Sequence, residues 1–275
     1  MTKTARRLHV SQPTLSRQLK SLEEELGKKL FVRSNYSIKL TEEGNLLKKR
    51  TEKILEMVNK TTEEIQTLDE VRGGDIHIGC AESNGIKYVI DVIKKLQKKY
   101  PLIRYHFYSS GTDEVNERMD SGLLDFAIIV QEADVSKYNC LKIPSMDRWG
   151  LIMRKDSPLA QKSSIRLEDL CHLPLILSRQ AMRQEMPKWF GEVQDQLHII
   201  ATYDLLFNAS VMVRENFGYA LVFEGLIHTG EDGDLCFRPL EPALESPMYV
   251  VWKKYQTFTP AAELIMKELK KKFLE

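Results

Sequence analysis

Apolar residues in the first part of the chain recur at alternating steps of four and three positions, which is the spacing of one helical face. This stripe consists of Leu15, Leu19, Leu22 and Leu26. At about 100° per residue, the opposite face carries Pro13, Arg17 and Lys20, flanked by Thr14 and Ser16. Ser11 is a suitable cap for the first turn and Gly27 for the end. The pattern therefore predicts an amphipathic helix whose four leucines point into a core and whose polar face is cationic near its N-terminus.

A shorter helical pattern precedes it. Thr4 to Leu8 are predicted to form a helix, and His9-Val10-Ser11 a tight joint between the two helices. Two helices with a tight turn between them and the small Ala5 at their crossing are typical of a helix-turn-helix, whose second helix enters the DNA major groove. The alternative is a surface helix that merely has a basic face.

Two short strands are predicted after Gly27, at residues 30–32 and 38–40, with a turn at residues 34–37. This hairpin is interpreted as a wing, in which Arg33 is placed to meet a DNA phosphate.

From Thr41 a second helical pattern extends to Gly73-Gly74, which are predicted to end it. Its seam positions alternate by four and three residues: Leu47, Thr51, Ile54, Val58, Thr61, Ile65 and Leu68. This spacing favours a coiled-coil connector that pairs two subunits, although two threonines weaken it. The alternative is a helix that packs on its own domain.

Beyond the glycines, short apolar runs alternate with amphipathic segments. The predicted strands are residues 75–81, 103–109, 125–130, 148–155, 173–178, 198–203, 218–223 and 247–254. The predicted helices are residues 85–100, 113–120, 187–194 and 205–216 and a terminal helix from Pro260. Such alternation predicts two α/β lobes, each with a parallel sheet covered by helices on both faces. The last strand and helix are expected to return to the first lobe.

Charge is distributed unevenly along the 275 residues, although the formal net charge is only +1. Residues 1–60 contain 14 Lys or Arg against 7 Asp or Glu, so this segment carries +7 and the remainder −6. A small basic module attached to a mildly acidic body is predicted. No apolar run reaches the roughly 18 residues that span a bilayer, and the N-terminal residues lack the apolar core of a signal peptide, which predicts a cytoplasmic protein.

Signatures of catalysis and metal binding are missing from the sequence. There is no G-x-S-x-G elbow, P-loop, dinucleotide fingerprint or H-E-x-x-H motif. His77 and His106 fall in predicted strands, where structural roles predominate. The four cysteines are far apart, without a C-x-x-C pair, so inert free thiols are expected. An enzyme is disfavoured, and neither a metal nor a cofactor is predicted.

The N-terminal segment resembles the LysR-type transcriptional regulators. The matching motif is A-x-x-L-x-V-S-Q-P-x-L-S-x-Q-L-x-x-L-E-x-x-L-G-x-x-L-F-x-R over Ala5 to Arg33, followed by Leu40 to Gly44. The remainder is also similar, including GLLDFAI from Gly122 and the ENFGYALV segment. The resemblance implies an α+β winged helix-turn-helix, a long linker helix and two Rossmann-like, periplasmic-binding-protein-like effector lobes. The implied domains are residues 1–40, 41–73 and 74–275, with lobe I at 74–145 and 249–275 and lobe II at 146–248.

The resemblance also implies partners and site residues. The partners are double-stranded promoter DNA, a small-molecule effector, further copies in a homodimer or tetramer, and RNA polymerase. The implied DNA-binding residues are Gln12, Pro13, Thr14, Ser16, Arg17, Lys20 and Arg33. The implied effector-binding residues, between the lobes, are Ser83, Thr112, Ser178 and Arg179. Hydroxyls beside helix N-termini suit anions, so a small carboxylate is the expected effector.

Two alternatives to an effector-controlled regulator remain at this point. Members of the family carry a further helix before the matched segment, and this chain starts inside the segment that follows, so the predicted helix-turn-helix is incomplete. A dimerising effector-binding protein that has lost DNA binding is therefore the first alternative. The second is a free-standing solute-binding receptor, which shares the two lobes but needs export.

Overall fold

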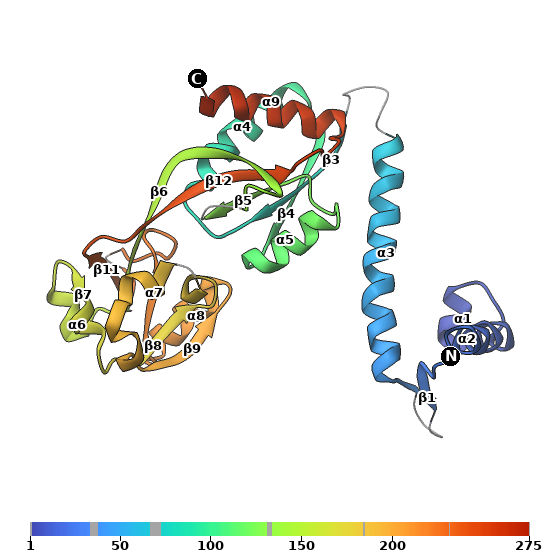
Figure 1. Ribbon diagram of the computed structural model, residues 1–275, viewed down its shortest axis with the longest axis horizontal. Helices are drawn as coiled ribbons and strands as arrows, with labels where there is room; N and C mark the ends of the chain where they lie inside the picture. The colour runs from blue at the N-terminus through green and yellow to red at the C-terminus, as the bar shows by residue number, and fades with distance from the viewer. Residues whose placement is uncertain are drawn as a thin grey trace. The chain divides into compact units, whose positions relative to one another are not determined.

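The computed structural model describes residues 2–33, 38–66, 73–130, 134–183, 185–230 and 232–274. The chain divides into two compact units, Met1–Thr62 and Glu63–Glu275. The first contains α1 (Thr2–Arg7), α2 (Gln12–Leu26), the strands β1 (Phe31–Arg33) and β2 (Ile38–Leu40), and most of α3 (Glu42–Gln66) (Figure 1). The predicted helices and hairpin strands are all present.

Local signals set the ends of α2. The Ser11 hydroxyl oxygen accepts a hydrogen bond from the Thr14 backbone N–H at 3.2 Å, and Pro13 lies in the first turn, where an N–H is not needed. At the other end Gly27 adopts φ 62°, a left-handed conformation that closes the helix. Ala5 is 2% exposed at the contact between α1 and α2, where a small residue was predicted.

The predicted apolar stripe of α2 is only partly covered. Leu15 is buried, Leu19 and Leu22 are half-buried, and Leu26 is 46% exposed. The prediction that all four leucines point into a core is therefore wrong for Leu26, which lies at the last position of the helix. A helical stripe is buried only where neighbouring elements cover it. In the described chain this cover is complete at Leu15, partial at Leu19 and Leu22, and absent at Leu26.

The wing is joined to α3 by a close backbone approach. Phe31 pairs with Leu40 in the antiparallel hairpin, and the Thr41 hydroxyl donates to the Lys29 carbonyl at 2.7 Å. The same hydroxyl oxygen accepts from the Gly44 N–H at 2.9 Å and so caps α3, as predicted. A Cβ at Gly44 would lie 2.1 Å from the Leu30 carbonyl oxygen, which explains the glycine.

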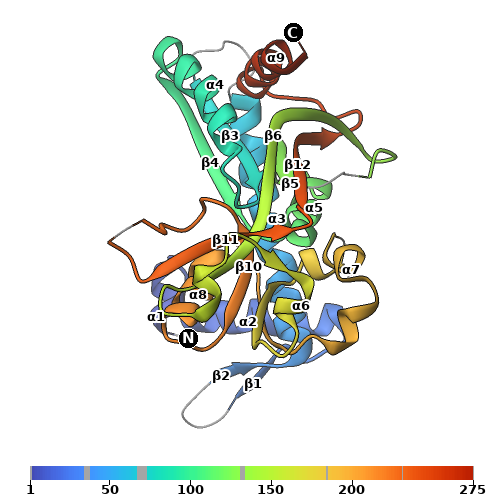
Figure 2. The ribbon, with the colours of Figure 1, turned by 90° about the vertical axis from the view of Figure 1, so that its left-hand side faces the viewer.

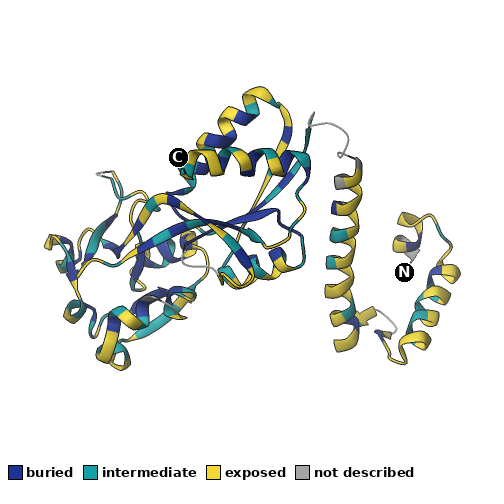
Figure 3. Ribbon diagram, turned by 45° about the horizontal axis from the view of Figure 1, so that its top comes forward, coloured by how far each residue is buried: buried dark blue, intermediate teal, exposed yellow. Residues whose placement is uncertain are grey.

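Helix α3 is exposed along nearly its whole described length (Figure 3). Its seam residues Ile54, Val58 and Ile65 are 61%, 53% and 63% exposed. Leu68, the last predicted seam position, lies outside the described residues. The predicted end of the helix was wrong, because Gly73 and Gly74 form the start of β3.

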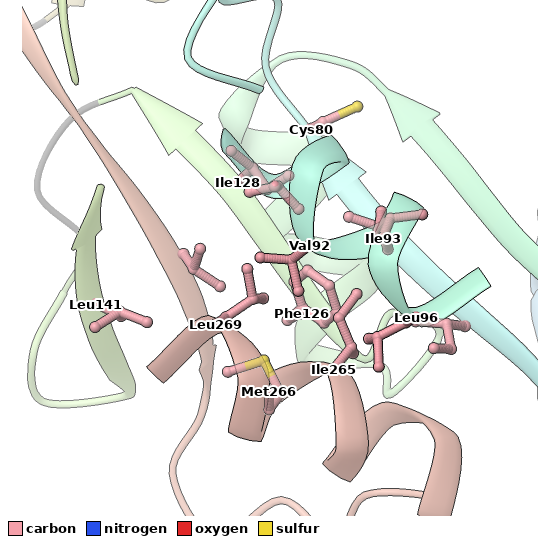
Figure 4. Close-up of a cluster of buried hydrophobic side chains, with 14 of the residues drawn as sticks. Cys80, Val92, Ile93, Leu96, Phe126, Ile128, Leu141, Ile265, Met266 and Leu269 are labelled. Atoms are coloured by element: carbon pink, nitrogen blue, oxygen red, sulfur yellow. The ribbon is translucent and has the colours of Figure 1, made fainter. Parts of the chain in front are cut away.

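The first lobe of the second unit is built on the strand order β4-β3-β5-β12-β6. Its strands are β3 (Gly73–Cys80), β4 (Leu102–Ser109), β5 (Phe126–Val130), the first half of β6 (Tyr138–Arg154), and β12 (Glu245–Lys253). Helices α4 (Ile86–Lys99) and α9 (Pro260–Leu274) cover one face, and α5 (Thr112–Asp120) covers the other (Figure 1). Apolar residues of α4, α9 and the sheet interdigitate in one core (Figure 4).

The second lobe has the strand order β6-β10-β8-β9, with β11 on β6 and β7 on β11. Its further strands are β7 (Ile165–Arg166), β8 (Leu175–Ser178), β9 (Ile199–Tyr203), β10 (Tyr219–Phe223) and β11 (Leu235–Glu241). Its helices are α6 (Leu167–Leu170), α7 (Glu185–Phe190) and α8 (Leu206–Arg214), with 3₁₀ turns η1 (Pro158–Gln161), η2 (Ala181–Arg183) and η3 (Gly191–Gln196). The predicted helix at 187–194 is thus divided between α7 and η3.

The sheet is mixed, not parallel as predicted. β12 is antiparallel to both β5 and β6, and β6 is antiparallel to β10 and β11. The long strand β6 runs through both lobes (Figure 2), whereas its first half, β7 and β11 were not predicted. The pairing of β12 with β5, together with the packing of α9 on α4, places the C-terminal segment in the first lobe, as expected.

Candidate functional site

The N-terminal half of α2 presents polar side chains to solvent. Gln12, Pro13, Thr14, Arg17 and Lys20 are exposed, whereas Ser16 is half-buried. Lys20 pairs with Glu24 one turn later at 3.4 Å, and both side chains are about two-thirds exposed. Arg33 ends β1, but its side chain lies outside the described residues. The structure therefore brings six of the seven predicted DNA-binding residues onto one helix.

Glu23 has a role that the sequence did not reveal. Its carboxylate accepts from the Leu30 and Phe31 backbone N–H groups at 2.8 and 3.2 Å and pairs with Lys29 at 3.1 Å. The backbone hydrogen bond from Leu30 is the largest cause of the lowered pKa of Glu23. Glu23 thus fixes the start of the wing to α2. A glutamate one turn before a C-terminal glycine was the only signal available.

A cleft lies between the two lobes of the second unit, at the carboxyl ends of their parallel strands. Its outer part is a cavity of about 290 Å³ lined by residues 110–114, Arg179, Gln180, Arg183 and Asp204. An inner recess of about 60 Å³ shares Ser110, Gly111, Gln180 and Asp204 with it. Ligands of open α/β sheets bind at such strand ends, because the connecting loops diverge there.

Three of the four predicted effector-binding residues line this cleft. Thr112 begins α5, and its N–H donates to the Gln180 side-chain oxygen at 3.0 Å. The Thr112 hydroxyl oxygen is buried and has no hydrogen-bond partner among the described residues. Ser178 ends β8 in the inner recess, and Arg179 pairs with Asp204 at 3.5 Å.

Ser83 lies elsewhere. It is 5% exposed, and its hydroxyl donates a hydrogen bond to Asp147, at the point where β6 passes from one lobe to the other. Burial raises the pKa of Asp147, and the Ser83 hydrogen bond and the charge of Lys87 only partly oppose this. Ser83 therefore joins the loop after β3 to the strand crossing and does not belong to the residues that line the cavity.

Polar contacts across the cleft involve residues that sequence reasoning did not select. The Glu82 carboxylate accepts from the Leu206 N–H at the start of α8, at 2.6 Å, and Asn84 donates to the Glu224 carbonyl at 2.8 Å. Arg183 pairs with Asp113. Glu82, Gln180 and Asp204 each follow the end of a parallel strand, so that position was a usable signal.

Neither a metal site nor a membrane span is found in the part of the chain that the structure describes. No group of three His, Cys, Asp or Glu residues there could hold a metal ion. No helix there has the length and apolarity needed to cross a bilayer.

A helix-turn-helix unit followed by two α/β lobes around a cleft defines a DNA-binding regulator with a ligand-binding domain. The family model described as "LysR substrate binding domain" matches residues 69–274, and "Bacterial regulatory helix-turn-helix protein, lysR family" matches residues 1–45. The chain belongs to the LysR family of transcriptional regulators. Loss of DNA binding is not favoured, because the helix-turn-helix model also matches, and the family consists of regulators and not of enzymes.

Relatives and solved structures agree with this assignment. The chain is 26% identical to the HTH-type transcriptional regulator YybE of Bacillus subtilis (strain 168), over 96% of this chain and 90% of that protein. It is 28% identical to the probable nitrogen assimilation transcriptional activator of Synechococcus elongatus, over 93% and 84%.

Full-length CbnR bound to its target DNA has the same fold, with a TM-score of 0.72 at 17% identity, over 98% of this chain and 93% of that one. The effector-binding domain of QuiR in complex with shikimate matches 74% of this chain and 98% of its own, with a TM-score of 0.64 at 17% identity.

Proposed function

We propose that this regulator reads a promoter sequence with the N-terminal half of α2. The observation that carries this proposal is the capped start of α2, which presents Gln12, Thr14 and Arg17 to solvent without a covering element in the described chain. Arginine can bind guanine bidentately, and glutamine can bind adenine. Pro13, Ser16 and Lys20 would pack against or contact the DNA backbone. Arg33 at the end of β1 would meet a phosphate.

Arg17→Ala tests this assignment. Gel-shift titration against the promoter next to the gene for this chain is expected to show a loss of about 1–3 kcal/mol in binding free energy if Arg17 contacts a base. If Arg17 contacts a phosphate, the slope of log affinity against log salt should fall by about one unit. Arg214→Ala, an exposed arginine on the second lobe, is the control. Equal affinity and equal salt slope for both variants would count against α2 as the reading helix.

The proposed assembly is a homodimer or a tetramer of such dimers, joined along the exposed seam of α3. Two-fold pairing of the DNA-binding units would require a pseudo-palindromic site, with half-sites about one helical turn or a multiple of it apart. RNA polymerase is the proposed partner at the promoter, and the cytoplasm is the proposed location. Binding of target DNA by CbnR supports the promoter partner by analogy.

The proposed effector is a small carboxylate bound in the cleft. The α5 N-terminus, Thr112 and Arg179 supply N–H, hydroxyl and guanidinium donors, and helix N-termini favour negative charge. Ser178 would contribute from the inner recess, and Ser83 would act from beneath by holding the loop after β3. Shikimate, which carries a carboxylate, is bound by the effector domain of QuiR.

Thermal shift of the full chain tests the effector site. A carboxylate present at 100 times its dissociation constant is expected to add about 2.7 kcal/mol to the free energy of unfolding. Thr112→Val removes the hydroxyl with little change in volume and should abolish that gain. A gain that survives Thr112→Val would place the effector elsewhere.

A further inference from the structure

The inner recess of the cleft has the chemistry of a cation site. Its wall contains the carboxylates of Glu82 and Asp204 and the aromatic rings of Trp149, Tyr203 and Phe223. The rings of Trp149 and Phe223 pack at 4.1 Å between centroids, tilted by 46°. Glu82 and Asp204 are exposed. Aromatic side chains and carboxylates together attract a positively charged nitrogen. The recess volume of about 60 Å³ suits a small polar head group and not a ring.

Glu82 contributes a negative charge that no cation balances. Its carboxylate accepts a hydrogen bond from the Leu206 N–H of the second lobe, and no ion pair with Glu82 occurs among the described residues. Burial raises the pKa of Tyr203, and the nearby charge of Glu82 raises it further. The same charge acts on Cys80, whose pKa is raised mainly by burial. The negative charge of Glu82 therefore acts on Tyr203 in the wall of the recess.

The outer cavity has the opposite chemistry at the start of α5. Gly111 before that helix makes no side-chain cap, although the Thr112 N–H donates to the Gln180 side chain. The buried Thr112 hydroxyl has no hydrogen-bond partner in the described part of the chain. Arg183 and Arg179 extend over the same cavity. A carboxylate placed there would receive helix N–H groups, a hydroxyl and guanidinium groups.

The charges of the whole cleft decide between two classes of effector. The cleft has a net negative charge. It is lined by two arginines, Arg179 and Arg183, and by four acidic residues, Glu82, Asp113, Glu114 and Asp204, so the acidic residues exceed the basic ones by two. Arg179 is paired with Asp204 and Arg183 with Asp113. Glu114 accepts hydrogen bonds from the Ser110 and Tyr108 hydroxyls, which hold its pKa below the usual value, so it is ionised at neutral pH. A dianion would add to this excess of negative charge, whereas a molecule that carries one positive and one negative charge would not.

We propose that the effector is amphoteric, with a carboxylate at the start of α5 and a protonated amine in the recess between Glu82 and the Trp149–Phe223 pair. This inference rests on the proposed effector site and adds the second charge of the ligand. Glu82 is then the residue that distinguishes an amino acid from a hydroxy acid or a dicarboxylate of the same length. A neutral hydroxyl in the recess would lack the charge–charge attraction to Glu82 that a protonated amine has.

Matched ligands test the proposal on the full chain. Thermal shift and calorimetric titration would compare ω-amino acids from glycine to 6-aminohexanoate with the hydroxy acids and dicarboxylates of the same chain lengths. The series also measures the spacing between the two ends of the site. At one length or more, the amino acid should bind at least about tenfold more tightly than its hydroxy acid.

Glu82→Gln keeps an oxygen for the Leu206 N–H but removes the charge, so it should erase that preference. Glu192→Gln, an exposed glutamate outside the cleft, should leave it unchanged. Tighter binding of dicarboxylates, binding of amino acids that is insensitive to Glu82→Gln, or no binding by any amino acid would overturn the proposal. Dicarboxylate binding that is lost in Thr112→Val would keep the effector site and reject only its amphoteric ligand. Operator binding is measured separately through Arg17→Ala.

Discussion

Asp147 is a buried carboxyl whose ionisation opposes the fold. Its pKa is raised above 3.8 mainly by burial, so between pH 3.8 and the raised pKa the folded chain binds a proton that the unfolded chain releases. A folded state that binds more protons loses stability as pH rises from 3.8 through the raised pKa. The full penalty is therefore present above the raised pKa and disappears in acid.

Asp147→Asn is expected to remove this pH dependence, because the amide oxygen still accepts from Ser83 and carries no charge. The variant should be at least as stable as the parent at pH 7, and the difference should shrink toward pH 4. Urea unfolding at a series of pH values measures it. Ser83→Ala is the contrasting variant, since it leaves the buried carboxylate without that donor and should cost about 1–3 kcal/mol. A parent and Asn variant with parallel pH profiles would disprove the account.

Gly44 is constrained by space. Because an added Cβ would lie 2.1 Å from the Leu30 carbonyl oxygen, Gly44→Ala must move α3 away from the wing. We expect a loss of about 1–3 kcal/mol in stability and weaker operator binding. Gly111 has nothing within 4 Å of an added Cβ, and Gly111→Ala should leave the free energy of unfolding nearly unchanged. Denaturant unfolding of both variants, followed by gel shift, compares them.

Helices α2 and α3 both carry an apolar stripe at helical spacing, but the surroundings differ. In α2 the stripe begins at the buried Leu15, whereas in α3 the seam from Leu47 to Ile65 remains mostly open. A long apolar seam that stays open in one chain is suited to pairing with a second chain. The open seam of α3 thus indicates that the chain associates with a second copy of itself.

Ile54→Glu is expected to weaken self-association at least about tenfold, because it places a charge in the seam. Asn59→Glu adds the same charge about 120° away from the seam on the same helix and should have little effect. Sedimentation equilibrium of the two variants and the parent provides the measurement. Unchanged association of Ile54→Glu would show that α3 does not pair subunits through this face.

At the scale of the whole molecule, the two lobes are joined by backbone. β6 continues from one sheet into the other, and β12 shifts its register on β6 between Pro247 and Met248, next to Asp147. Side-chain contacts across the cleft add to this connection, but Arg183 and Asp113 are 64% and 81% exposed. Solvent screens such a pair, so it should be worth less than a buried contact.

A double-mutant cycle of Asp113→Ala and Arg183→Ala is expected to give a coupling of about 0–1 kcal/mol in the free energy of unfolding. The coupling should fall further at 1 M salt, where the screening length is about 3 Å. A coupling above about 2 kcal/mol would mean that this ion pair, and not the continuous strand, holds the lobes together.

The sequence by itself determined the elements whose signals are local. Ser11, Gly27 and Thr41 set helix ends by hydrogen bonds to their own neighbours, and Pro13 fits a first turn that needs no N–H, so the helix-turn-helix, the wing and α3 could be predicted. The N-terminal motif determined the family, which the family models confirm. The domain boundaries and the individual binding residues stay predictions.

Tertiary structure alone decided the direction of the strands and the content of the cleft. The sequence of β12 has the apolar pattern of any buried strand, and only its pairing with β5 and β6 makes it antiparallel. Glu82 and Ser83 are adjacent in sequence, yet they have different partners. The Ser83 hydroxyl bonds to Asp147, whereas the Glu82 side chain bonds to the start of α8. Partners in both cases are more than 60 positions away, and no local pattern specifies which distant groups the fold brings within hydrogen-bonding distance.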